Sequence, residues 1–115
     1  MKLNEIIECF GLAVFSKPGG DPELTHGYAS DLLSDVMANA GKNSVWLTMQ
    51  THLNIVAVAE LKDIAAVLVT GGRKPAAEII ATAESKGVCI LGTGLPTFEA
   101  AGRLHAKGLR GTLTK

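Results

Sequence analysis

The sequence lacks an excess of charge of either sign. Lys and Arg together number 11, as do Asp and Glu, so the formal net charge of the 115-residue chain is zero. Proteins that bind nucleic acids or anionic membrane surfaces usually present a basic patch or tail, and no such stretch occurs here. We therefore expect neither a nucleic acid nor a membrane as partner. Because a net charge near zero does little to keep copies of a chain apart, it permits self-association.

The sequence also lacks long apolar runs and has few cysteines. No apolar stretch approaches the roughly 20 residues that cross a bilayer, and residues 1–5 show no apolar segment typical of a secretory signal. Cys9 and Cys89 are far apart and each lies in an apolar run, which favours two reduced, buried thiols over a disulfide. These features predict a cytoplasmic protein.

Short apolar strands followed by helices dominate the rest of the sequence. The clearest unit is the apolar strand Ala65–Val69, the turn Thr70–Gly72 and a helix entered through Pro75. A strand that leads through a glycine turn into a helix is the repeating unit of a parallel sheet. The neighbouring strands are followed by helices in the same way. Three successive units therefore predict a mostly parallel sheet with helices packed on both faces.

We predict a single α/β domain over residues 1–115. The expected helices are residues 3–10, 30–40, 51–62, 75–86 and 96–107. The expected strands are residues 12–15, 24–29, 45–49, 65–69 and 88–91, and residues 111–115 are expected to form a frayed tail.

The third helix is apolar nearly all round from Leu53 to Leu61. Such a helix is buried on more than one side. In a small domain its outer face then needs a partner, so we expect a homodimer.

Polar residues and glycines gather where the predicted parallel strands end. Ligands of open α/β sheets bind at the carboxyl ends of the strands, and backbone N–H groups there, with Arg73, suit a phosphate or carboxylate. The alternative is that these residues serve only as turns and helix caps. His52 is either a ligand or dimer contact or a structural histidine. The predicted ligand-binding residues are Gln50, Thr51, His52, Asn54, Thr70, Gly71, Gly72, Arg73, Thr93 and Gly94.

No pattern in the sequence indicates catalysis, a metal or a cofactor. Gly41–Ser44 lacks the upstream glycine and the spacing of a phosphate-binding P-loop, and Gly92–Gly94 lacks the third glycine of the dinucleotide-binding pattern. The three histidines have no cysteine or carboxylate at metal-ligand spacing. Asp31 and Asp35 share one side of a predicted helix, where we expect a solvated face rather than a cation site. We predict no catalytic residue, no metal site and no cofactor.

Three segments of the sequence resemble the DRTGG-domain family. They are Gly27–Ala40, Trp46–Ala57 and Val67–Gly72 with its following helix, and the resemblance extends over nearly the whole chain. The chain is similar to the stand-alone members of the family. The resemblance implies a fold like that of the amino-terminal domain of HPr kinase. It also implies a regulatory or assembly role, commonly as dimers.

The resemblance implies an adenine nucleotide as ligand where the family occurs beside CBS domains. The sequence departs from the naming motif, since Asp-Arg-Thr-Gly-Gly is absent and Gln50–His52 stands where related modules have Gly-Asp-Arg. Without a P-loop, kinase activity is not expected. Three functions remain as alternatives. The first is a homodimeric, non-catalytic module that modulates a metabolic enzyme or signalling partner, the second is a sensor of an adenine nucleotide or other anion, and the third is a small enzyme.

Overall fold

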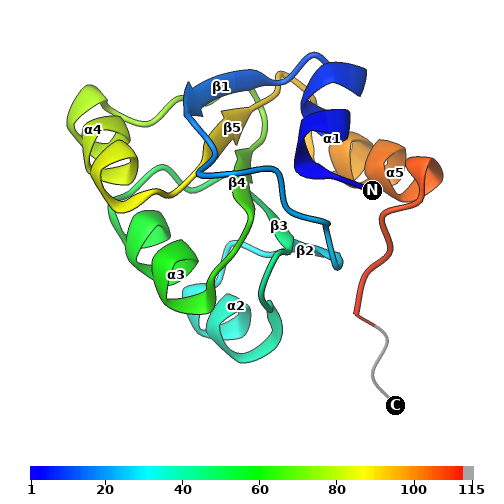
Figure 1. Cartoon of the computed structure of the whole chain (residues 1–115), viewed down its shortest axis with the longest axis horizontal. Coiled ribbons are helices and arrows are strands. Elements are labelled where there is room, and N and C mark those ends of the chain that lie inside the picture. The colour runs from blue at the N-terminus through cyan, green and yellow to red at the C-terminus, as the bar shows by residue number, and fades with distance from the viewer. Residues whose placement is uncertain (113–115) are drawn as a thin grey trace.

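A computed structural model describes residues 1–112 of the chain (Figure 1). The frayed tail expected over residues 111–115 lies, in its last three residues, outside the described part. The strands of the described part are β1 (Ala13–Ser16), β2 (Gly27–Ala29), β3 (Val45–Thr48), β4 (Ala66–Val69) and β5 (Ile90–Gly92). Its helices are α1 (Leu3–Cys9), α2 (Leu33–Asn39), α3 (Asn54–Lys62), α4 (Ala77–Lys86) and α5 (Thr97–Lys107).

The strands form one sheet in the order β1-β5-β4-β3-β2. β2, β3, β4 and β5 run parallel to one another, whereas β1 pairs with β5 in the antiparallel direction. Each parallel pair is connected through one helix, α2, α3 or α4, as the repeating strand–helix units require. The predicted α/β fold with a mostly parallel sheet is therefore confirmed.

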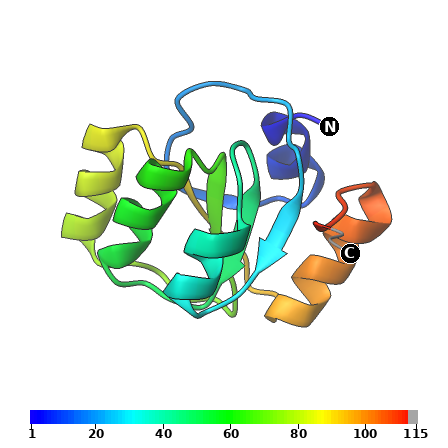
Figure 2. The same cartoon turned by 90° about the horizontal axis from the view of Figure 1, so that it is seen from below.

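Helices cover both faces of the sheet, as the sequence predicts. Figure 2 shows α2, α3 and α4 in a row on one face, and α1 and α5 on the other. Because successive side chains of a strand point to opposite faces, the central strands contribute to two separate cores. Trp46 and Val67 pack in the core beneath α2, α3 and α4, while Leu47 and Leu68 pack in the core beneath α1 and α5.

Several elements differ from the prediction at their ends. β2 covers only the last three residues of the strand expected over 24–29, because Leu24 N–H donates to the Met1 carbonyl and Thr25 N–H to the Asn43 carbonyl, outside the sheet. α3 begins at Asn54 rather than at Thr51, which leaves a loop between β3 and α3. At β2, hydrogen bonds to distant segments therefore set the boundary rather than local propensity.

The two cysteines have different surroundings. Cys89 is buried, as predicted, and burial raises the pKa of its thiol to about 12. Cys9 is exposed, so the prediction of a buried thiol is wrong there. Leu3 and Ile6 are the side chains that α1 buries against the sheet, and Cys9 lies off this stripe at the end of the helix.

The Ser16 side chain replaces backbone hydrogen bonds where β1 pairs with β5. The β1–β5 register shifts between Val14 and Ser16, which marks an irregularity in the ladder. The fully buried Ser16 hydroxyl donates to the Val88 carbonyl at 2.8 Å and accepts from the Ile90 N–H at 2.7 Å. One side chain thus forms hydrogen bonds with two backbone groups, the Val88 carbonyl before β5 and the Ile90 N–H within it.

Replacement of Ser16 by Ala should destabilise the domain, because it removes the partner of both backbone groups. An unsatisfied buried polar group costs about 1–3 kcal/mol, so we expect S16A to lower the free energy of unfolding by about 2–3 kcal/mol in urea titrations. The control S34A changes an exposed serine of α2 and should stay within about 0.5 kcal/mol. A loss in S16A no larger than that of S34A would contradict this role.

Candidate functional site

Two hollows, each of about 410 Å³, lie where the parallel strands end, and Arg73 borders both. We call this edge the rim. The hollow beside β3 is lined by Asp31, Met49, Gln50, Thr51, His52 and Arg73. The hollow beside β5 is lined by Phe10, Gly11, Ala13, Phe15, Gly72, Arg73, Gly92, Thr93 and Gly94. The structure thus places seven of the ten predicted residues around two adjoining hollows.

Three of the predicted residues line neither hollow. Asn54 lies exposed at the start of α3, and Gly71 lies in the turn after β4. Thr70 is fully buried, and its hydroxyl lies 2.6 Å from the Thr97 hydroxyl at the start of α5. Thr70 therefore links the exit of β4 to the start of α5 rather than facing a ligand.

The glycines after β4 make a structural turn. Both Gly71 and Gly72 have a φ of +74°, in the left-handed region that glycine adopts at little cost. The Gly71 N–H donates to the Leu95 carbonyl at 2.8 Å, and the Gly72 N–H donates to the Thr93 carbonyl at 2.9 Å. These two backbone donors are already used between loops. They are therefore not free to bind an anion at the rim. Arg73, the next residue, is exposed and makes no ion pair within residues 1–112.

Asp31 orders the loop that follows β3. One oxygen of its carboxylate, Oδ1, accepts from the Thr48 hydroxyl at 2.7 Å and from the Met49 N–H at 2.8 Å. The Gln50 side-chain amide donates to the Asp31 carbonyl. Asp31 thus ties the segment after β2 to the exit of β3 and positions the hollow that contains His52. Sequence reasoning missed this role, because the partners are far apart in the chain.

Asp31 and Asp35 do not form a pair. Asp31 precedes α2, which begins at Leu33, whereas Asp35 lies within the helix. Asp35 accepts from the Tyr28 hydroxyl at 2.9 Å, and the hydroxyls of Ser30 and then Tyr28 lower the pKa of its carboxyl. The two carboxylates therefore order different segments, and no cation site arises from their spacing.

The three histidines also lie in separate places. His52 lines the hollow beside β3, while His105 lies on α5. The His26 ring accepts from the Gly41 N–H through Nε2 at 3.2 Å and contacts the Thr25 hydroxyl through Nδ1 at 3.1 Å, and burial lowers its pKa. Within the described part of the chain, no group of three metal-ligating side chains forms. No helix there has the length and apolar character to cross a membrane.

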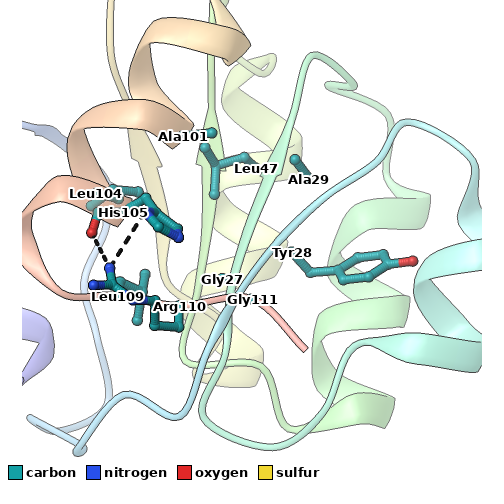
Figure 3. A pocket seen from close by; sticks show the side chains of 10 residues that line it. All are labelled: Gly27, Tyr28, Ala29, Leu47, Ala101, Leu104, His105, Leu109, Arg110 and Gly111. Carbon is teal, nitrogen blue, oxygen red and sulfur yellow. Dashed lines mark hydrogen bonds between the residues drawn. The ribbon is translucent and has the colours of Figure 1, made fainter. Parts of the chain in front are cut away.

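A further cavity, of about 160 Å³, lies on the other side of the sheet from α3 (Figure 3). It is enclosed by α5, by β2 and by the segment Leu109–Gly111. Sequence reasoning did not anticipate it. The available signal was glycine and alanine at alternate positions of β2, Gly27 and Ala29, which leave little side-chain volume on one face of that strand.

Comparison with known proteins identifies the family. The sequence model of one protein family, the DRTGG domain, matches residues 35–106. The structure is similar to the CBS and DRTGG domains of the regulatory region of a Clostridium perfringens pyrophosphatase, solved with the activator diadenosine tetraphosphate. The TM-score is 0.69 at 17% identity. The alignment covers 94% of this chain and 47% of the other, so the chain spans about half the length of that protein.

No curated protein matches the sequence. Since the family model covers more than half of the sequence, the chain belongs to the DRTGG domain family.

Proposed function

We propose that the chain is a non-catalytic regulatory or assembly module that forms homodimers and modulates a metabolic enzyme or a signalling partner. Membership of the DRTGG domain family supports a regulatory role, because the similar Clostridium perfringens structure is the regulatory region of an enzyme. The observation that carries the proposal is the apolar outer face of α3.

The outer face of α3 exposes an apolar stripe. Leu53, Ala57 and Leu61 are spaced four residues apart, so they lie on one side of the helix. The exposed fraction is 53% for Leu53 and 69% for Leu61. A shallow groove of about 210 Å³ runs beside the stripe, between α3 and α4, and Val56 forms part of its floor. Contiguous exposed apolar surface of this kind marks interaction sites.

The charges beside the stripe suit a second copy of the chain. Glu60 on α3 and Lys86 on α4 flank the groove, 3.9 Å apart, and both side chains are about half exposed. A two-fold interface brings the same surface from both copies together, so each copy contributes one carboxylate and one ammonium beside the stripe. The net charge of zero adds no general repulsion between copies. We therefore propose that α3 packs against α3 of a second copy.

The arrangement of the rim supports a binding or regulatory role over catalysis. General acid–base catalysis needs a titratable side chain within hydrogen-bond reach of the proton that it transfers. Asp31, the carboxylate of the hollow that contains His52, already accepts from Thr48 and Met49. In the described residues, no other Asp or Glu lines this hollow.

A charge placed in the stripe should separate the dimer. L61E puts one carboxylate per copy into the apolar contact. It also removes from each copy a leucine that the dimer would bury. We expect a loss of about 3 kcal/mol, or a rise in the dimer dissociation constant of roughly 100-fold. Sedimentation at micromolar concentration measures this. The matched control is L32E, because Leu32 is equally exposed (65%) but lies outside α3. A monomeric wild-type protein, or equal dissociation of both variants, would refute the proposal.

The second candidate is a sensor of an adenine nucleotide or another small anion. The observation that favours it is Arg73, an exposed guanidinium without an ion pair in residues 1–112, between two hollows large enough for a nucleotide-sized ligand. A guanidinium binds phosphate oxygens in a bidentate manner. His52 and Thr93 then provide polar contacts on either side of it.

Calorimetry with AMP, ADP, ATP and inorganic pyrophosphate tests the sensor. We expect at least one of them to bind below millimolar concentration, and R73A to weaken it by at least about tenfold through the loss of charge-assisted hydrogen bonds. R103A serves as the control, because Arg103 lies on α5 beside Glu99 and borders neither hollow of the rim. If no compound binds below millimolar concentration, or if R73A binds as the wild type does, the sensor hypothesis fails.

A further inference from the structure

The cavity beside α5 has apolar walls. Leu47 of β3, Ala101 and Leu104 of α5, and Leu109 after α5 supply its apolar side chains, and the backbone of Gly27–Ala29 closes one side. In Figure 3 the Tyr28 ring points away from the cavity, toward the opposite face of the sheet, where its hydroxyl bonds Asp35. β2 therefore presents backbone and small side chains to the cavity.

Specific contacts keep this cavity open. The Gly27 N–H donates to the Arg110 carbonyl at 2.9 Å, which holds the segment after α5 against the edge of the sheet. A Cβ on Gly27 would lie 3.3 Å from a side-chain methyl of Leu109, so a larger residue there would press on that side chain. Ala29 and Ala101 leave the remaining space unfilled. The cavity thus exists because small residues stand in β2 and α5.

Two polar side chains, Arg110 and His105, line the cavity. The Arg110 guanidinium donates to the His105 carbonyl, and its NH1 lies 3.4 Å from His105 Nδ1. A guanidinium can only donate, so Nδ1 is the acceptor in this contact, and Nε2 is the ring nitrogen that can donate to a ligand. Figure 3 shows both side chains at the same wall. The guanidinium retains unused N–H groups, and no Asp or Glu of residues 1–112 lines the cavity.

We propose that this cavity binds a small monocarboxylate with an apolar body of about six carbons. A closed apolar cavity of about 150 Å³ holds a molecule the size of benzene. The cavity found here has a similar volume, about 160 Å³, and it is open to solvent where the exposed His105 and Arg110 line it. The apolar body contacts Leu47, Leu104 and Leu109, while the carboxylate accepts from Arg110 and His105 Nε2. A second charged group would be placed against apolar walls, which disfavours phosphates and dicarboxylates. The site shares no residue with the rim or with the stripe of α3, so it stands independently of the proposed function.

Titration of the ¹⁵N-labelled protein with hexanoate at neutral pH tests the site. We expect saturable shifts of the amide signals of Gly27, Ala29, Leu104 and His105, with a dissociation constant of roughly 1 mM or below. Hexanamide has the same body without the charge, and acetate has the charge without the body. Both should bind at least about tenfold more weakly. Equal binding of hexanamide, or no saturation by hexanoate at about 20 mM, would overturn the proposal.

Two variants separate the body from the carboxylate. A101L fills the cavity and should abolish the hexanoate shifts, whereas A106L, at an exposed alanine of the same helix that does not line the cavity, should leave them unchanged. R110Q should weaken hexanoate about tenfold and leave hexanamide as it was. Because Arg110 is exposed, this variant remains informative even if A101L fails to fold. Unchanged hexanoate binding in R110Q would contradict the assigned carboxylate contact.

Discussion

Burial of β3 and β4 on both faces is the constraint on which the rest of the domain depends. No residue of these two strands is more than 2% exposed, and their side chains alternate between the two helical layers. A strand buried in this way presents no polar side chain to solvent along its length. Polar chemistry is therefore confined to the loops where the strands end, or to the outer surfaces of the helices.

Hydrogen bonds connect the loops of the rim to one another and to neighbouring segments in the absence of a ligand. Asp31 holds the exit of β3 through Thr48, and the turn after β4 donates from Gly72 to the Thr93 carbonyl of the next loop. These bonds use the backbone donors that a glycine turn otherwise offers to an anion. The N–H groups of Gly71 and Gly72 are thus not free to bind an anion, and Arg73 is the exposed cation that borders both hollows.

The sequence predicts the parts of the fold that follow from local apolar patterns. The unit Ala65–Pro75 is recognisable because a strand buried on both faces is continuously apolar and glycine marks its end. The exposure of Cys9 depends on how α1 is rotated against the sheet, which its short stripe does not determine. Asp31 and the cavity beside Gly27 depend on contacts between distant segments, and no local pattern reveals those.

The central claim is that α3 packs against α3 of a second copy, and oxidative cross-linking tests it most directly. A two-fold axis through the stripe places Ala57 close to Ala57 of the other copy. In a C9S background, which removes the exposed native thiol, A57C should form a disulfide-linked dimer. A cysteine at the exposed Ala106, on the opposite layer, should not. Cross-linking of A106C alone, or of neither variant, would contradict the account.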